Sequence, residues 1–189
     1  MNAETVEYAM TVFFETPRLI ARRFDPRDLA EFTAMRADPQ VARYQNWENF
    51  TEEDGRKFLH DIAASEPGAP GWFQFALEER GTGHFVGDCG LRTMEHDSRL
   101  GQIGYTIVRH QWNRGFASEA VRGLVGHAFA SYPFHRITAS VDPRNTGSCR
   151  VLEKAGFAKE AHFVKSEWFK GEWADDAVYA VLRHSFHLL

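Results

Sequence analysis

The segment at residues 104–119, GYTIVRHQWNRGFASE, constrains the fold most, because a strand pattern runs through a glycine into a helix pattern. Residues 105–108 alternate and are rich in β-branched side chains, whereas apolar residues recur at helical spacing over 116–129. Gly115 lies where the backbone must approach a neighbour without a Cβ in the way. A helix start offers unpaired N–H donors and a positive dipole end. The segment therefore predicts a site for a pyrophosphate-bearing cofactor.

Length and charge limit the classes of protein to which the chain can belong. Its 189 residues, 43% of them hydrophobic, are enough to fold as one domain around a sizeable core. The formal net charge is −4 and no long basic run occurs, which argues against nucleic-acid binding. No set of His, Cys, Asp or Glu residues has the spacing of metal ligands. We expect one globular domain with no metal and no nucleic-acid partner.

Cysteine usage and the N-terminus indicate the compartment. Cys89 and Cys149 show no CxxC spacing and give no disulfide framework, which is typical of a reducing compartment. A packed, unreactive role is favoured for Cys149 over that of a nucleophile. The first 15 residues carry acids and no leading basic cluster, unlike a signal peptide. No apolar run approaches the roughly 20 residues of a membrane-spanning helix. We expect a cytoplasmic protein without membrane contact.

The N-terminal half is predicted to hold a strand, two helices and three more strands. Residues 19–24 alternate like a strand, and Pro26 opens a helix that Pro39 ends. Thr51 begins a capping box that opens a second helix. After a turn-rich loop, three strands are expected at 72–79, 84–94 and 99–108.

The C-terminal half continues with the helix after Gly115, a strand at 135–142 and a short helix at 145–155. Two late strands, near 157–166 and 174–185, meet across a turn at Lys170-Gly171. The predicted order is β-α-α-β-β-β-α-β-α-β-β, a mixed α/β domain over residues 16–189. Residues 1–15 are expected to be an N-terminal extension.

Two blocks in this half resemble a known family. WNRGFASEA, at 112–120, resembles the acetyl-coenzyme A loop of the GNAT acetyltransferase superfamily, and VDPRNTGSCRVLEKAGF, at 141–157, resembles its other cofactor segment. With TPRL at 16–19 and GEWADDAVYAVL at 171–182, the chain is similar to the ribosomal-protein N-terminal acetyltransferase (RimJ/RimL-like) branch. The resemblance implies a GNAT-like fold, with a mixed, mostly antiparallel sheet of six to seven strands and about four helices. It also implies an acetyl-coenzyme A-dependent N-acetyltransferase.

Two departures from the family pattern bear on the prediction. Trp112 stands where the wider superfamily has Gln or Arg, and a bulky aromatic there is familiar in the RimJ/RimL-like branch. Many members carry a Tyr near the positions of Val151 and Leu152, which protonates the leaving thiolate, and this chain has none there. Ser148 is the nearest alternative hydroxyl. We consider two roles for Ser148, proton donor to the thiolate and local helix cap.

Cofactor contacts are expected mainly from the main chain. Backbone N–H groups of residues 113–118 are expected to bind the pyrophosphate, and Arg114 is expected to add a charged contact. The resemblance implies that main-chain groups near Val108 bind the thioester and its oxyanion. Asn145 either binds the pantetheine arm or caps its helix. The predicted cofactor residues are Ile107, Val108, Asn113, Arg114, Gly115, Phe116, Ala117, Ser118, Asn145 and Ser148.

The acceptor side is less specified by the sequence. Glu167 lies in the last hairpin and resembles the acid there that is the proposed base of the RimJ/RimL-like branch. A solvated carboxylate without a catalytic role is an equal alternative for Glu167. Reserve candidates are Asp88, Glu95 and His96. Trp47, Tyr105 and Trp168 are predicted substrate contacts. The acceptor is a protein N-terminal α-amine or a small-molecule amine, and the chain is a monomer or homodimer. An alternative function is a non-catalytic acyl-coenzyme A sensor or interaction module.

Overall fold

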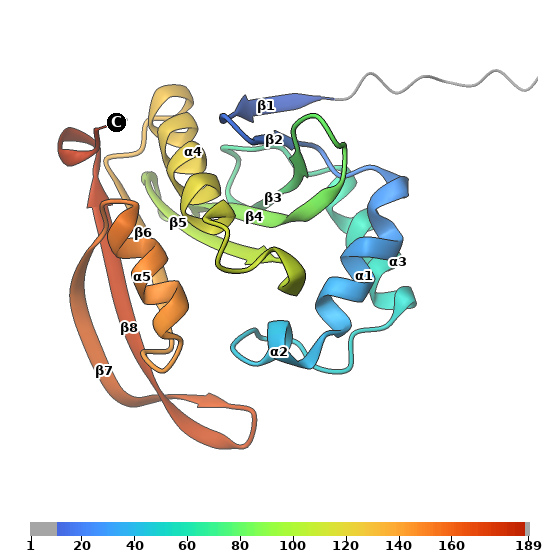
Figure 1. Ribbon diagram of the computed structural model, residues 1–189. Helices are drawn as coiled ribbons and strands as arrows, with labels where there is room; N and C mark the ends of the chain where they lie inside the picture. The colour runs from blue at the N-terminus through green and yellow to red at the C-terminus, as the bar shows by residue number, and fades with distance from the viewer. Residues whose placement is uncertain (1–10, 188–189) are drawn as a thin grey trace, which may run out of the picture.

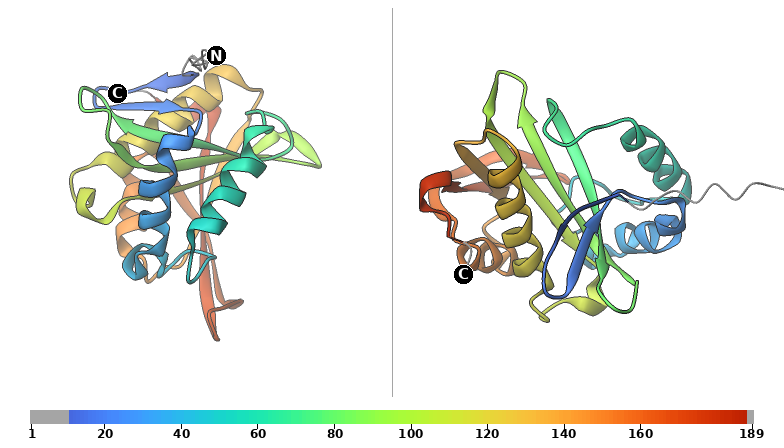
Figure 2. Two further views of the ribbon diagram at one scale, coloured as in Figure 1. Left: turned by 90° about the vertical axis from the view of Figure 1, so that its right-hand side faces the viewer. Right: turned by 90° about the horizontal axis from the view of Figure 1, so that it is seen from above.

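The computed structural model describes residues 11–187 and is built on one eight-stranded sheet with helices on both faces (Figures 1 and 2). The strands lie in the order β1-β2-β3-β4-β5-β6-β8-β7. Their bounds are β1 Val12–Glu15, β2 Leu19–Arg22, β3 Gly71–Glu79, β4 Phe85–Met94, β5 Asp97–Ile107, β6 Arg136–Val141, β7 Ala158–Phe169 and β8 Glu172–Leu182. The α-helices of the described residues are α1 Leu29–Ala37, α2 Pro39–Ala42, α3 Glu52–Ala63, α4 Phe116–Ser131 and α5 Thr146–Lys154.

The predicted α/β class is confirmed, and the strand count of six to seven is corrected to eight. The unforeseen strand β1 lies within the expected extension, whose residues 1–10 fall outside the described part of the chain. It pairs antiparallel with β2 and packs Phe13 edge-on against Phe73 and Phe75, with ring centroids 5.2 Å apart. Four residues give too short an alternation to identify a strand from sequence alone.

Local signals explain where the helices begin. Thr51 caps α3 through a complete capping box, as expected, and Asp38 caps the short helix α2 directly after α1 ends. The helix predicted from Pro26 begins as the 3-10 turn η1 (Pro26–Asp28) and becomes regular at Leu29. Lys170 and Gly171 both have positive φ and form the expected turn between β7 and β8.

Two apolar clusters fix the sheet between its helices. The larger one joins β3, β4 and β5 to α4, whose buried stripe includes Phe116, Leu124 and Phe129. The smaller one lies on the α1 side and includes Phe32, Met35 and Phe85. Figure 2 shows these two helical layers on opposite faces of the sheet. Packing on both faces holds β4 between α4 and α1.

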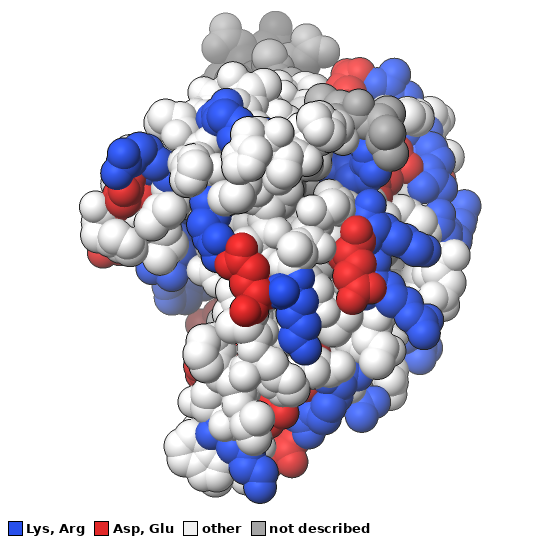
Figure 3. Space-filling model, turned by 90° about the vertical axis from the view of Figure 1, so that its left-hand side faces the viewer, with Lys and Arg blue, Asp and Glu red and all other residues white. Residues whose placement is uncertain are grey.

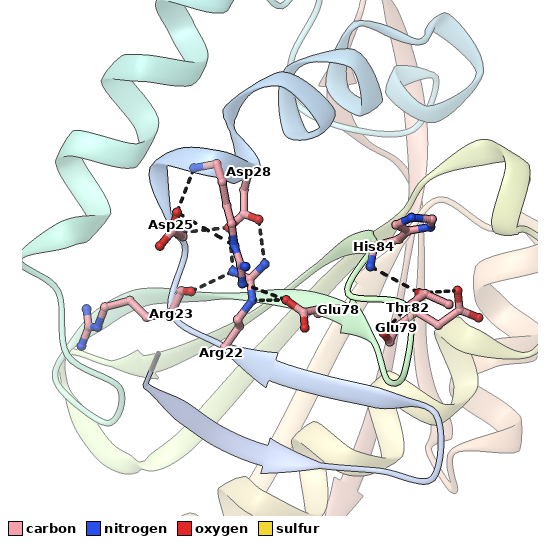
Figure 4. Close-up of polar contacts among 9 residues, drawn as sticks. Arg22, Arg23, Asp25, Asp28, Glu78, Glu79, Thr82 and His84 are labelled. Carbon is pink, nitrogen blue, oxygen red and sulfur yellow. Dashed lines mark hydrogen bonds and ion pairs between the residues drawn. The ribbon is translucent and has the colours of Figure 1, made fainter. Parts of the chain in front are cut away.

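A buried ionic cluster holds β2 against η1 and β3 (Figure 4). Arg22 is 1% exposed and binds both Asp28 oxygens at 2.7 Å and Glu78 at 2.8 Å. The largely exposed Arg27 also binds Glu78, at 3.0 Å. The alternating pattern of residues 19–24 predicted the strand but gave no sign that a charged side chain on it is buried. Pairing and hydrogen bonds on all sides make that burial tolerable.

The sheet opens between β5 and β6. These strands run parallel and pair only through Leu100–Arg136, Gly101–Ile137 and Gln102–Thr138, whereas the other neighbouring strands are antiparallel. Beyond Gln102 no further register pair joins them within the described residues. The main-chain groups on one edge of β5 therefore face an opening rather than a strand.

The β7–β8 hairpin extends beyond the rest of the molecule (Figure 1). Most side chains of β7 are exposed, including Phe163 and Trp168. Glu167, which lies just beyond the strand predicted near 157–166, is within β7 and pairs with Ala174. The hairpin is longer than the sequence suggested, because exposure on both faces removes the hydrophobic alternation that identifies a strand.

Candidate active site

A cavity of about 290 Å³ lies at the opening between β5 and β6. Its wall combines β5, β6, the start of α5, the β7–β8 hairpin and the segment after α2. Four of the predicted catalytic or substrate-side residues are brought together here, together with Asn145. The residues that line it include Tyr44, Tyr105, Asp142, Asn145, Ser148, Glu167, Trp168, Asp175 and Asp176.

The glycine loop ends in a helix start whose N–H groups are available. Asn113 and Gly115 have φ of 62° and 85°, and α4 begins directly after Gly115. No side chain caps α4, whereas Thr51 caps α3 and Asn145 caps α5. An uncapped first turn presents main-chain donors at the positive end of a 16-residue helix. Such a start suits a phosphate oxygen.

The TPRL segment holds this loop in place. Glu119, in the first turn of α4, accepts from the Thr16 hydroxyl at 2.6 Å, from the Arg18 amide at 2.8 Å and from the Arg18 side chain at 2.6 Å. Burial alone would raise the pKa of Glu119, but these hydrogen bonds outweigh it and lower the pKa below its ordinary value. Glu119 therefore fixes its own loop, and Arg18 also binds the Arg114 carbonyl at 2.9 Å.

Side chains of the loop serve mainly to shape it. Phe116 is 1% exposed and packs in the core beneath the Arg18 guanidinium, so only its main chain is offered to a ligand. The half-exposed Arg114 lies 3.9 Å from Glu79 and also binds Gln111. Trp112 donates its indole N–H to the Ile107 carbonyl at 2.7 Å. That bond ties the head of the loop to the end of β5.

The main-chain N–H groups near Val108 point in two directions. The Val108 N–H donates to the Val86 carbonyl at 2.9 Å, so it is engaged within the sheet. Strand alternation then turns the N–H groups of Tyr105 and Ile107 toward β6, where the strands part. The N–H groups near Val108 that face the opening are thus those of its neighbours on the edge of β5.

Ser148 is held from two directions. Its N–H donates to the Asn145 side chain at 3.1 Å, which makes Asn145 the helix cap. Its hydroxyl lies 2.6 Å from the Tyr105 hydroxyl, which also reaches the Ser148 carbonyl at 3.2 Å. Ser148 is therefore not the cap of its helix, and its side chain faces β5 at the cavity wall.

Glu167 and Trp168 line the cavity from β7, but Trp47 does not. The Glu167 carboxylate makes no hydrogen bond or ion pair within the described part of the chain. Trp168 is 64% exposed and packs edge-on against Trp173. Trp47 donates to the Arg36 carbonyl at 3.0 Å and covers its guanidinium, so its contacts are structural.

The reserve candidates for the base lie elsewhere. Asp88 is buried in an ion pair with Arg36 at 3.2 Å, on the α1 side of the sheet. Glu95 and His96 form the exposed turn between β4 and β5. Of the four candidates, only Glu167 lines the cavity.

The cavity carries charge of one sign. Four of its lining residues are carboxylates, and none of the described lining residues is Lys, Arg or His. Asp142 pairs with Arg144 and Asp175 with His162, both from outside the lining. On the face drawn in Figure 3, by contrast, acidic and basic side chains lie interspersed. The cavity therefore favours a cationic ligand.

Several lining residues escaped the sequence analysis. Tyr44 lies just after α2 and donates to the Arg144 carbonyl at 3.3 Å, which joins the N-terminal helices to the start of α5. Arg144 in turn binds Glu172 of the hairpin at 2.6 Å. No local pattern marks Tyr44. Asp175 and Asp176 stand in the quoted segment 171–182, but only the fold shows that they border the cavity.

Among residues 11–187, no group of three or more His, Cys, Asp or Glu side chains is arranged to hold a metal ion. No helix in this range is long and apolar enough to cross a membrane. Cys89 is buried, Cys149 is half-buried, and both are free thiols.

Comparison with known proteins supplies the context for this geometry. The model of the acetyltransferase (GNAT) domain family matches residues 18–158. An uncharacterised N-acetyltransferase, p20, from Bacillus licheniformis is 30% identical over 175 residues, covering 90% of this chain and 96% of its own. A GNAT-family acetyltransferase from Bacillus anthracis superposes with a TM-score of 0.82 at 30% identity, over 90% and 98% of the two chains. Mycobacterium smegmatis RimJ, in complex with a coenzyme A disulfide, gives a TM-score of 0.75 at 25% identity, over 87% and 81%.

Proposed function

Because the chain belongs to the GNAT family and is an acetyl-coenzyme A-dependent N-acetyltransferase, we propose that it acetylates a cationic primary amine by direct attack on the thioester. The single observation that carries this proposal is the cavity at the opening between β5 and β6. Glu167 and Ser148 both line this cavity, and four carboxylates border it, Glu167 among them.

Acetyl-coenzyme A would be held along one continuous path. Its pyrophosphate binds the N–H groups at the uncapped start of α4, beside Gly115. Its pantetheine arm follows the open edge of β5, where the N–H groups of Tyr105 and Ile107 face away from β4. The thioester then reaches the cavity, and these donors are placed to stabilise the oxyanion.

Glu167 is the proposed base. An ammonium must lose a proton before its nitrogen can attack, and a carboxylate within reach accepts that proton directly or through one water. Glu167 supports this role because it lines the cavity and its carboxylate has no partner among residues 11–187. Ser148, which also lines the cavity, is the proposed hydrogen-bond donor to the leaving sulfur.

The acceptor is inferred from the charge of the cavity. Carboxylates with no basic neighbour in the lining raise the local concentration of ammonium groups and repel anionic amines. A peptide N-terminus and a small polyamine share this chemistry, and Trp168 offers either of them an exposed aromatic wall.

The test is turnover of a panel of amines with acetyl-coenzyme A, followed by release of free thiol. Peptides with free N-termini and linear polyamines form the two arms, and N-acetylated peptides serve as blanks. In a separate comparison, an amino acid is tested beside its own amide, which lacks the carboxylate. We expect the amide to have the higher kcat/KM. Equal or better turnover of the free acid would contradict a carboxylate-lined acceptor site, and absence of thiol release with every amine would refute the transfer itself.

A further inference from the structure

The hydroxyls of Tyr105 and Ser148 lie 2.6 Å apart in the cavity wall. They come from different elements, β5 and α5, and are 43 residues apart in sequence. The distance is that of a short O–H···O hydrogen bond. Since each hydroxyl carries one proton, one of the two must donate and the other is free to donate elsewhere.

Helix α5 contains no tyrosine. Leu152 is 1% exposed and Val151 packs against the core, so neither offers a polar group. Tyr105 brings a phenol from the neighbouring strand to the same place. The other tyrosine in the lining, Tyr44, donates to the Arg144 carbonyl instead.

We propose that Tyr105 is a positioning residue, which donates to Ser148 Oγ and thereby directs the Ser148 proton into the cavity, toward the leaving sulfur of the acyl donor. The Asn145 side chain fixes the Ser148 backbone at 3.1 Å, and Tyr105 fixes its hydroxyl. This inference rests on the proposed acetyl transfer and assigns a residue to it.

Burial keeps Tyr105 available as a donor, and Ser148 Oγ at 2.6 Å is a nearer acceptor for its proton than the Ser148 carbonyl at 3.2 Å. Burial raises the pKa of Tyr105 well above its ordinary value, so the phenol keeps its proton at neutral and mildly alkaline pH. Tyr105 and Ser148 each donate a hydrogen bond, and neither needs to transfer its proton. The amine nitrogen bonds to the acetyl carbon, the bond between that carbon and sulfur breaks, and its electron pair stays on sulfur. The ammonium loses two protons: Glu167 takes the first before the attack and passes it to solvent, and then takes the second as the tetrahedral adduct collapses. Coenzyme A leaves as a thiolate that accepts the Ser148 hydrogen bond and later takes a proton from water.

The experiment measures single-turnover rates, so that product release does not mask the chemical step. The variants are Tyr105→Phe, Ser148→Ala and the two combined, assayed with an amine that wild type acetylates. We expect each single variant to slow the step by about 10- to 100-fold, as for loss of a hydrogen bond to a charged group. The double variant should be no slower than Ser148→Ala, and the Kd for acetyl-coenzyme A should change less than about twofold.

Tyr179→Phe is the matched control. Tyr179 is also a buried tyrosine next to α5, 3% exposed, but its hydroxyl binds Glu153 at 3.4 Å. It should keep the wild-type rate, with any change confined to thermal stability. A purely structural role for Tyr105 would lower stability in the same way and leave the rate unchanged.

The outcomes separate cleanly. A Tyr105→Phe or Ser148→Ala rate within twofold of wild type, or a double variant slower by the product of the two single losses, would overturn the proposal. If Tyr105→Phe fails to fold, 3-fluorotyrosine at position 105 keeps the ring and strengthens the donor. It should then alter the rate only while Ser148 is present, and an equal effect in Ser148→Ala would also overturn it. Wild type without turnover would instead refute the proposed function.

Discussion

Lys170 Nζ donates to the main-chain carbonyl of Ala42 across 2.7 Å and to that of Trp47 across 3.1 Å. The turn of the β7–β8 hairpin is thereby bound to the segment that follows α2. Both segments border the cavity on its acceptor side, through Phe169 and Tyr44. One side chain therefore sets the spacing between two walls that have no strand pairing between them.

Removing this link should loosen the acceptor site alone. We expect Lys170→Met to raise KM for the amine by about 3- to 10-fold, the value of one or two hydrogen bonds, with KM for acetyl-coenzyme A unchanged. Lys165→Met, which removes a charge from the same hairpin, is the control. Steady-state kinetics with each substrate varied in turn checks the prediction, and an equal rise for both substrates would contradict it.

Glu167→Gln should slow acetyl transfer, because the amide cannot accept the ammonium proton. We expect kcat to fall by about 10²–10⁴-fold, the usual contribution of general base catalysis, and the acidic limb of the pH–rate profile to change. Affinity for acetyl-coenzyme A should stay near wild type. Glu160→Gln, on the same strand but paired with Arg136, is the control. An unaltered pH–rate profile in Glu167→Gln would remove Glu167 from the mechanism.

Gly115→Ala should weaken cofactor binding. Gly115 has φ of 85°, which costs an L-residue about 1–2 kcal/mol, and an added Cβ would lie 3.3 Å from an Arg18 nitrogen. Gly81→Ala is a matched control, since its φ is 86° and nothing lies within 4 Å of the added Cβ. Calorimetric titration with coenzyme A should give about a tenfold weaker Kd for Gly115→Ala only. Equal affinities in the two variants would count against the loop.

Glu119 should make stability depend on pH. Its pKa is lower in the folded chain than the ordinary 4.5, so the unfolded chain binds more protons in this range. Its contribution, about 1–3 kcal/mol, is complete above the unfolded pKa and is lost as pH falls through the folded one. Urea unfolding at several pH values between 3 and 7 gives the free energy of unfolding as a function of pH. This free energy should depend less steeply on pH for Glu119→Gln than for wild type. Parallel curves would show that the Thr16 and Arg18 bonds contribute nothing.

Local patterns in the sequence were sufficient where function depends on neighbours in the chain. The turn at Gly115, the start of α4 and the cap at Asn145 each follow from a few adjacent residues, and the structure has all three. The local structure on which the proposed cofactor site depends was predictable for that reason.

The acceptor side was not predictable in the same way, because five separate segments form it. Trp47 illustrates the difficulty: its aromatic character suggested a substrate wall, but Arg36 lies beneath its ring at 4.1 Å. Arg22 is the converse case, a charge on a strand that becomes the most buried cation of the described chain only because Asp28 and Glu78 meet it. Such pairings exist only after the chain has folded.

The parting of β5 from β6 has a consequence for the cohesion of the molecule. Three register pairs, from Leu100 to Gln102, join β1–β5 to the smaller group of β6, β8 and β7. A ligand that spans this seam contacts both groups and binds only when they are aligned, so its binding free energy adds to the stability of the whole sheet. The supply of the acyl donor would then govern how long the folded enzyme lasts, as well as how fast it works.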